Sequence, residues 1–341
     1  MSSRVRLQDV ADKARVSSTT ASLVLSGRAE EFRIAAVTRD AVLEAAHRLG
    51  YVRRVTQRSG RRATPPLWTL FAPSDFDSGP TRQFFDGVQG YLRENKLQVD
   101  CIVLPFERGR LEEKRHWISP DFARGAVMVG LTDEDVAFID AHEFELPIVL
   151  ANRTARGCAS VVVDDYSAGQ QAMQHFLARG LSEFVIVSPT HTSRALSMRT
   201  IGFTDALQQV GGRASSSVQS CYADVYDEPG FAAALDALTL PTARVGFFVL
   251  NDQMVGGLTN WLQGRALVVP RDAEIISYGD SPINTVVRPP VTSLRVPSHD
   301  MSVECARTLQ QAISHRGSMT GAIRSFGTEL IARESSPLLP N

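Results

Sequence analysis

Several features are scarce or absent in this sequence, and each absence excludes a class of protein. No stretch of the 341 residues reaches the about 18–20 consecutive apolar residues that a membrane-spanning helix requires. Residues 1–9 are polar and lack the apolar core of a secretory signal, so we expect a cytoplasmic protein. The four cysteines are far apart and form no Cys-x-x-Cys pair, which argues against structural zinc or a disulfide framework and favours buried free thiols.

Motifs for catalysis are missing as well. The seven histidines are scattered, and the chain contains no His-Glu-x-x-His, Gly-x-Ser-x-Gly or Gly-x-x-x-x-Gly-Lys-Ser/Thr pattern. We therefore expect that the protein is not an enzyme and that it needs no cofactor and no metal ion.

The residues that are present indicate a globular protein with an uneven charge distribution. Hydrophobic residues make up 43% and charged residues 21%, and the length suits two or three domains of about 100–200 residues each. Residues 1–64 hold 13 basic and 6 acidic residues, which leaves 23 basic and 31 acidic residues in the rest of the chain. A basic head on an acidic body suggests a module that binds a polyanion, although an ordinary solvated surface would explain the same counts.

Three apolar periodicities predict a compact helical module in the basic head. Ser17 stands where it can cap the second helix, and Gly50 closes the third. Two short helices joined by a tight turn and supported by a third helix make a helix-turn-helix. The inward-facing residues of the three helices are Leu7, Val10, Ala11 and Ala14, then Thr20, Ala21, Val24 and Leu25, then Val42, Ala45, Ala46 and Leu49.

The segments 7–11, 16–28, 38–46 and 49–51 resemble the DNA-binding head of the LacI/GalR family of bacterial repressors. The resemblance implies that residues 4–51 form this domain and that the second helix lies in the major groove of double-stranded DNA. A three-helix bundle that binds a protein partner is the alternative interpretation.

The resemblance also assigns roles to individual residues. Ser18, Thr19 and Leu23 match the positions that face bases, but hydroxyl and leucine side chains make no contact specific enough to reveal the operator sequence. Arginines would supply the salt-dependent binding to phosphate. The expected DNA-binding residues are Leu7, Ser17, Ser18, Thr19, Thr20, Ser22, Leu23, Arg28, Arg54 and Arg58.

Residues 52–66 form a basic linker that departs from the family pattern. Gly60 stands where the family has a leucine that wedges into the minor groove, and glycine costs a helix about 1 kcal/mol relative to alanine. We expect the five arginines of this linker to bind DNA as an extended arm, with weak bending of the operator. A plain disordered tether is the alternative, and Pro65-Pro66 mark the domain boundary.

From residue 67 onward, short apolar runs alternate with helical patterns. This alternation predicts parallel sheets with helices on both faces, and the length of the segment favours two lobes with a ligand cleft between them. The expected strands are 68–72, 99–104, 126–129, 147–150, 161–163, 184–187, 245–250 and 274–278.

Segments throughout this body resemble the sensor domain of the same family, among them 83–87, 147–153, 161–169, 198–203, 251–257, 278–281 and 289–294. The resemblance implies a small all-α helix-turn-helix domain followed by an α/β two-lobed, periplasmic-binding-protein-like domain with two doubly wound parallel sheets. The chain would cross three times between lobes. Residues 67–335 would form this domain, with lobe 1 at 67–163 and 298–325 and lobe 2 at 164–294 and 326–335.

The resemblance places an effector site in the cleft between the lobes. Arg199 matches the arginine that clamps ligand hydroxyls, with a surface ion pair as the alternative. Asn251 fits either a polar ligand contact or a helix cap, and Phe85 fits either the apolar floor under a sugar ring or the core. The expected effector-binding residues are Ser74, Asp75, Phe85, Asn152, Arg199, Asn251 and Asp280.

Two acids that the family often carries are missing from this cleft. Asn152 occupies the position of one, and Gly279 that of the other, with Asp280 one residue later as a substitute. Because carboxylates accept the stronger hydrogen bonds from hydroxyls, their loss weakens the case for a neutral sugar. The ligand is then a modified or phosphorylated sugar, a different small molecule, or none.

We therefore expect a homodimeric transcriptional regulator, a repressor, that binds a near-palindromic operator and responds to a sugar or sugar derivative. A regulator whose body serves only dimerisation or partner binding is one alternative. A solute-binding protein or enzyme with an incidental head is another.

Overall fold

A computed structural model describes residues 7–25, 29, 32, 34–49, 67–74, 78–190, 193–210, 216–224, 227–241, 243–314 and 321–339. The chain divides into two compact units, Met1–Thr64 and Pro65–Asn341. The expectations for Arg28, Arg54, Arg58, Asp75 and the linker 52–66 concern positions outside the described residues.

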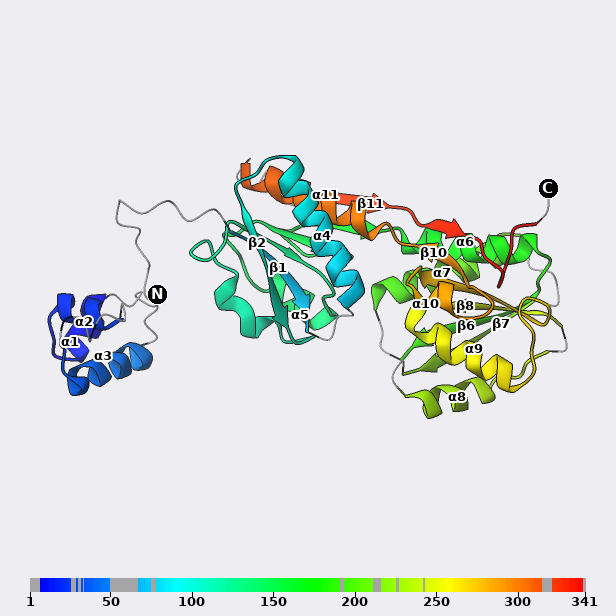
Figure 1. Ribbon diagram of the computed structural model, residues 1–341, viewed down its shortest axis with the longest axis horizontal. Coiled ribbons are helices and arrows are strands. Elements are labelled where there is room, and N and C mark those ends of the chain that lie inside the picture. Colours follow the sequence, from blue (N-terminus) through cyan, green and yellow to red (C-terminus); the bar gives the residue numbers. More distant parts are fainter. Residues whose placement is uncertain are drawn as a thin grey trace. The chain divides into compact units, whose positions relative to one another are not determined.

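The N-terminal unit contains the predicted helix-turn-helix (Figure 1). Helices α1 (Leu7–Lys13) and α2 (Ser18–Leu25) meet at a tight turn in which Arg15 has a positive φ of 54°. Helix α3 (Ala36–Leu49) packs against both. The predicted inward stripes are confirmed, because Val10, Ala11, Ala21 and Val42 are all completely buried.

The first lobe of the larger unit is built on a six-stranded parallel sheet. Its strand order is β11-β5-β4-β3-β1-β2. The strands are β1 (Leu67–Pro73), β2 (Asp100–Phe106), β3 (Gly125–Met128), β4 (Ile148–Ala151), β5 (Ala159–Val163) and β11 (Ile323–Phe326).

The second lobe has a sheet of the same size in the order β12-β10-β9-β8-β6-β7. All neighbouring strands are parallel except β10 and β12. The strands are β6 (Glu183–Pro189), β7 (Ser217–Ala223), β8 (Val245–Val249), β9 (Ala273–Gly279), β10 (Thr292–Arg295) and β12 (Glu329–Ile331).

Helices cover both faces of each sheet, as strand–helix alternation predicts (Figure 1). In the first lobe, α4 (Ser78–Glu94) and α11 (Ser298–Ser314) share one core, and α5 (Asp133–Asp140) with the 3₁₀ helix η1 (Leu111–Trp117) covers the other face. In the second lobe, α6 (Asp165–Ala178) and α7 (Arg194–Gln209) cover one face. Helices α8 (Glu228–Asp236) and α9 (Val255–Gly264) cover the opposite face. A short helix, α10 (Ile283–Val286), lies between β9 and β10.

The chain passes three times between the lobes, as the resemblance implied. It leaves the first sheet after β5, returns after β10 into α11, and leaves again between β11 and β12. All three passages lie close to sheet ends, so polar residues that follow strands are brought to the region between the lobes.

Several smaller findings concern chemistry at the surface and in the core. None of the described helices is long and apolar enough to cross a membrane. The four cysteines are free; Cys101 is half-buried and the other three are buried, and burial raises the pKa of Cys158 to about 12. Thiols with so high a pKa are unreactive.

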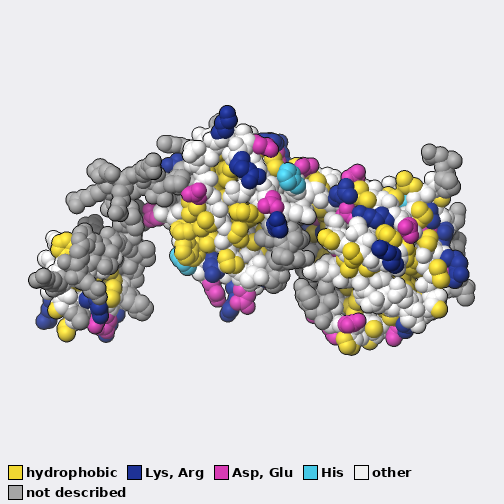
Figure 2. Space-filling view, in the orientation of Figure 1, with side chains coloured by type: hydrophobic (Ala, Val, Ile, Leu, Met, Phe, Trp, Pro, Cys, Tyr) yellow, Lys and Arg dark blue, Asp and Glu magenta, His cyan; other side chains and the backbone are white. Residues whose placement is uncertain are grey.

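On the face seen in Figure 2, acidic and basic side chains are interspersed over both lobes, so the acidic excess of the body forms no continuous field there.

Candidate functional site

The start of α2 is fixed by the side chain predicted to cap it. Ser17 Oγ accepts a hydrogen bond from the Thr20 backbone N–H at 3.1 Å and shares a second hydrogen bond with Thr20 Oγ1 at 2.9 Å. The N-cap prediction for Ser17 is confirmed. Such a cap contributes about 1 kcal/mol to a helix, and both hydroxyls are used, at least in part, to shape the N-terminus of α2.

The exposed side of α2 carries the residues expected to face bases. Thr19 is exposed, and Ser18 and Leu23 are half-buried, whereas Ala21 and Val24 lie in the core. Ser18 Oγ donates to Gln8 Oε1 at 2.5 Å, which joins the starts of α1 and α2. These three side chains therefore share one accessible side of a firmly held helix.

Two further expected DNA-binding residues have mixed surroundings. Leu7 is half-buried and packs against the head core, and Ser22 is half-buried on α2. A packing role is evident for Leu7, and DNA contact by either residue stays a prediction.

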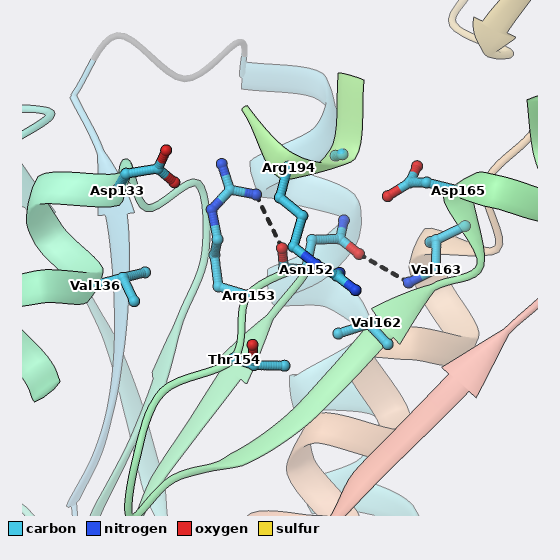
Figure 3. Close-up of a pocket in the computed structure, with 10 residues that line it drawn as sticks. Asp133, Val136, Asn152, Arg153, Thr154, Val162, Val163, Asp165 and Arg194 are labelled. Atoms are coloured by element: carbon cyan, nitrogen blue, oxygen red, sulfur yellow. Dashed lines mark hydrogen bonds between the residues drawn. The ribbon is translucent and has the colours of Figure 1, made fainter. Parts of the chain in front are cut away.

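In the larger unit, a pocket of about 150 Å³ lies between the two lobes (Figure 3). The first lobe contributes α5 and the ends of β4 and β5, and the second contributes the starts of α6 and α7. The lining residues are Asp133, Val136, Asn152, Arg153, Thr154, Val162, Val163, Asp165, Arg194 and Ala195.

Asn152 follows β4 in the left-handed region, with a φ of 57° that asparagine tolerates better than most residues. Its Oδ1 accepts a hydrogen bond from the Val163 backbone N–H at 3.1 Å, so the side chain ties β4 to β5 (Figure 3). Asn152 is nevertheless exposed and lines the pocket, as expected of an effector-site residue. Its ligand role stays a prediction.

Arg153, the next residue, has an unsatisfied guanidinium group. Its Nη1 donates to the carbonyl of Asn152 at 2.9 Å, but its buried Nε has no hydrogen-bond partner among the described residues. Burial lowers the pKa of Arg153, and Arg108 and Arg199 lower it further, against the attraction of Asp133 and Asp165. A buried donor without an acceptor is costly, by about 1–3 kcal/mol, and marks a position where a ligand acceptor would be stabilising.

Arg194 is the first residue of α7 and enters the same pocket from the second lobe (Figure 3). It is exposed, and its side chain forms neither a hydrogen bond nor an ion pair with any described residue. Ser193 caps α7 by accepting from the Leu196 N–H at 3.3 Å, and the first N–H groups of a helix carry partial positive charge.

Arg199 lies deeper in the second lobe and is already paired. Its Nε donates to Asp165 Oδ1 at 2.8 Å, its Nη1 donates to the Leu250 carbonyl at 2.9 Å, and its guanidinium carbon lies 3.3 Å from the centre of the Tyr278 ring. Tyr278 Oη also donates to Asp165 at 2.8 Å. The predicted clamp for ligand hydroxyls is thus part of a buried three-residue cluster, and its ligand contact stays a prediction.

Close packing of α6 on α7 explains this cluster. A Cβ on Gly169 would come within 2.1 Å of the Arg199 carbonyl oxygen, and a Cβ on Gly202 within 2.0 Å of the Tyr166 carbonyl oxygen. Only glycine permits this approach, which brings the starts of the two helices together and places Arg199 beside Asp165.

The other polar candidates of the second lobe are also paired internally. Asn251 caps the short 3₁₀ helix Asp252–Met254 (η2) by accepting from the Gln253 N–H at 3.0 Å, in agreement with the cap alternative. Asp280 Oδ2 accepts a hydrogen bond from Arg295 Nε at 2.8 Å, and Asp280 Oδ1 forms an ion pair with Arg333 at 2.7 Å but has no hydrogen-bond partner among the described residues.

The glycine that replaces one expected acid has a structural cause. A Cβ on Gly279 would lie 2.6 Å from Asp252 Oδ2, and Gly279 has a φ of 131°. Asp252 therefore occupies the space beside Gly279, where it accepts from the Ser281 N–H and from Asn284 Nδ2. Burial raises the pKa of Asp252.

Phe85 and Ser74 lie outside the described pocket lining. Phe85, on α4, is half-buried and packs against the first-lobe core that α4 shares with α11, in agreement with the core alternative. Ser74 is exposed after β1, and its N–H donates to the Phe106 carbonyl at 2.7 Å. Effector contact by these two residues stays a prediction.

The candidate list drawn from the sequence missed Asp133, Arg153, Asp165 and Arg194. Arg153 carried a usable signal, because it follows a predicted strand and ligands bind beyond the carboxyl ends of parallel strands. Arg194 carried none, because the segment before it shows no pattern. Among the described residues, no group of His, Cys, Asp or Glu is close enough to hold a metal ion.

Comparison with known proteins agrees with both units. Residues 6–54 match the model for bacterial regulatory proteins of the lacI family, and residues 173–336 match the periplasmic binding protein-like domain. The probable HTH-type transcriptional repressor ExuR of Bacillus subtilis (strain 168) is 26% identical over 339 residues, which cover 97% of this chain and 98% of that protein.

Two solved structures share the fold over nearly the whole chain. The lac repressor dimer bound to operator and the anti-inducer ONPF has a TM-score of 0.67 at 18% identity, and covers 98% of this chain and 100% of that one. The complex of transcriptional regulator CelR with cellobiose has a TM-score of 0.67 at 22% identity, and covers 97% of this chain and 100% of that one.

Proposed function

Because this chain belongs to the LacI family of bacterial regulatory proteins, we propose that it is a repressor that binds a near-palindromic operator as a homodimer. A small molecule between the two lobes would control its affinity for that operator. The family consists of DNA-binding transcriptional regulators and not of enzymes. The protein would act in the cytoplasm, where the chromosome lies.

The observation that carries this proposal is the geometry of α2. Its N-terminus is capped by Ser17, its inner side is buried, and Ser18, Thr19 and Leu23 share its accessible side. This is the arrangement in which a recognition helix enters the major groove and its N-terminal residues contact base edges. We assign DNA binding to residues 4–51 and effector binding and dimerisation to residues 67–335. Residues 52–66 connect these two domains.

An apolar hollow on the second lobe supports dimerisation. It has a volume of about 370 Å³ and is lined by α9 and the loops around Val268 and Pro289. Val268, which lines the hollow, is 45% exposed, and Val286, three residues before Pro289 in the sequence, is 62% exposed. Exposed apolar surface of this kind marks protein–protein contacts, and the solved lac repressor relative is a dimer on its operator.

The region between the lobes supports an effector. The pocket there is lined by residues from both lobes, so a ligand that bridges them would favour one arrangement of the lobes over another. The CelR relative was solved with cellobiose. A coupling free energy of about 1–3 kcal/mol would change operator affinity by about 5–150-fold.

A regulator that senses no ligand is the second candidate. It is favoured by the internal pairing of Arg199 with Asp165 and of Asp280 with Arg295 and Arg333, since these ion pairs balance the side-chain charges without a ligand.

Footprinting of the full-length protein on DNA upstream of its own gene tests the proposal. We expect protection of two half-sites about one helical turn apart, at a protein concentration where sedimentation shows a dimer. Adding sugars and sugar derivatives one at a time separates the two candidates, because an effector changes the protection and a ligand-insensitive regulator shows no change. Absence of any specific protection would overturn the proposal.

A further inference from the structure

The pocket between the lobes has an excess of positive charge that the protein itself does not neutralise. Arg153 and Arg194 enter it from different lobes, and neither forms an ion pair with a described residue. Two carboxylates also line it, but Asp165 is bonded to Arg199 and Tyr278. Asp133 is the one lining carboxylate that no arginine pairs with among the described residues, and the attraction of Asp165 for Arg153 is shared with Arg199.

The donor chemistry of these groups is suited to an oxyanion. The Arg153 Nε is buried and has no acceptor, and a guanidinium offers several fixed donors that match the geometry of a carboxylate or phosphate. Arg194 and Ala195 belong to the first turn of α7, a helix of 16 residues, whose N-terminal N–H groups favour negative charge. Two guanidinium groups and the N-terminus of α7 thus belong to the lining of one small pocket.

The replacement of the family's acid by Asn152 also favours an anionic ligand. With Asn at position 152, the side chain still bonds the Val163 N–H through Oδ1, but it adds no negative charge beside the Arg153 guanidinium. The neutral polar side chains of Asn152 and Thr154 can form hydrogen bonds with hydroxyl groups of a ligand. A pocket of about 150 Å³ is smaller than the about 300–1,000 Å³ usual for ligand sites, so the ligand is small.

We propose that the effector of this regulator is a small hydroxylated anion whose carboxylate or phosphate is bound jointly by Arg153 from the first lobe and Arg194 from the second. This inference rests on the proposed function, which it narrows from a small molecule to an anionic one. Because one oxyanion would join arginines on both lobes, binding also supplies the link that favours one arrangement of the lobes.

The test is a calorimetric titration of the full-length dimer at constant ionic strength with matched probes. One set is D-glucose, D-glucuronate and D-glucose 6-phosphate; a second is D-galactose, D-galacturonate and D-galactose 6-phosphate; a third is D-ribose, D-ribonate and D-ribose 5-phosphate. Inorganic phosphate is included alone. In at least one set we expect an anionic member to bind at least about 10-fold more tightly than its neutral partner, the ratio for one charge-assisted contact. The acid and phosphate arms distinguish the two sources of the anion.

Variants assign the preference to the two arginines. Arg153→Gln/Arg194→Gln should abolish the preference, so that the anionic member binds no more tightly than its neutral partner. Arg156→Gln is the matched control, because Arg156 is exposed, lies three residues after Arg153 and does not line the pocket. Equal or tighter binding of the neutral sugars, no binding of any anionic probe, or a preference that survives in the double variant would overturn the inference.

Operator affinity measured on the same samples separates failure of the anionic effector from failure of the proposed DNA-binding function. If the wild-type protein binds its operator but shows no anion preference, this inference fails and the DNA-binding function stands. If the wild-type protein fails to bind operator, the proposed function itself fails.

Discussion

The second helix of the head and the second lobe of the body both carry polar residues that match family positions, but they differ in how those residues are satisfied. On α2, Thr19 is exposed and shares the accessible side of the helix with Leu23 and with Ser18, whose hydroxyl makes one neutral hydrogen bond to Gln8. In the second lobe, Arg199 and Asp280 are bound by ion pairs to neighbouring side chains. Matching a family position therefore indicates that a residue matters, and its existing partners indicate whether it matters for stability or for binding.

Substitution of Glu274 is expected to lower the free energy of unfolding more than any other change considered below. Glu274 is completely buried on β9, and its carboxylate contacts Arg179 at 2.5 Å and Arg244 at 3.0 Å. Glu274→Ala leaves the nearly buried Arg179 unpaired, so we expect the free energy of unfolding to fall by about 3–5 kcal/mol. Urea denaturation measures this loss, and a loss below about 1 kcal/mol, the range of exposed ion pairs, would show that the network is not a stabilising one.

Arg199 and Arg194 sharpen the comparison directly, because they lie on the same helix. Arg199→Ala leaves the buried Asp165 without its ion-pair partner, so we expect the free energy of unfolding to fall by about 3 kcal/mol. Arg194→Ala removes no contact with a described residue, and we expect a change within about 0.5 kcal/mol. Equal losses from the two substitutions, measured by urea denaturation, would contradict the distinction between paired and unpaired arginines.

Ser17 is a polar side chain of the head with an evident structural role, as the cap of α2. Ser17→Ala removes the cap of α2 and should lower the local stability of the helix by about 1 kcal/mol, which speeds hydrogen exchange of the Thr20 amide about fivefold. Ser22→Ala on the same helix is the control and should leave that exchange rate unchanged. Unchanged exchange in the Ser17 variant would mean that another group caps the helix.

The smallest expected effect is the pH dependence contributed by His175 on α6. Burial, followed by the charge of Arg179, lowers the pKa of His175, whose Nε2 lies 3.0 Å from Ser336 Oγ. Since the folded pKa lies below the unfolded value of about 6.5, this contribution to stability is complete above that pH and is lost as the pH falls through the folded pKa. His175→Gln should therefore flatten the fall in unfolding free energy between pH 7.5 and 5.5, and an identical fall in both proteins would refute the assignment.

Much of the fold followed from apolar patterning. All eight strands expected from apolar runs are present, and the fold class is confirmed. The strands that were not expected are β7, β10, β11 and β12. Strand β7 has three exposed residues and lies at a sheet edge, and β11 is almost entirely exposed, so neither required the apolar run that marks a buried parallel strand.

The site was less predictable, because its properties depend on pairings between distant parts of the chain. Arg199 matched a ligand-binding position, but nothing in the sequence showed that Asp165, 34 residues earlier, would pair with it. Gly279 stood out as a missing acid, and only the three-dimensional structure shows that Asp252 occupies the space beside it. The unsatisfied donor of Arg153 likewise follows from burial.

The central claim is that the accessible side of α2 reads DNA. The most direct test compares footprints of the full-length parent and a Ser18→Ala/Thr19→Ala/Leu23→Ala variant on the same operator, after matching thermal unfolding shows that both are folded. We expect the variant to need at least about 10-fold more protein for equal protection, because three lost contacts at about 0.5–1.5 kcal/mol each, the value of an ordinary hydrogen bond, together exceed the roughly 1.4 kcal/mol of a tenfold change. Equal protection of the same stretch of DNA by both proteins would contradict the account.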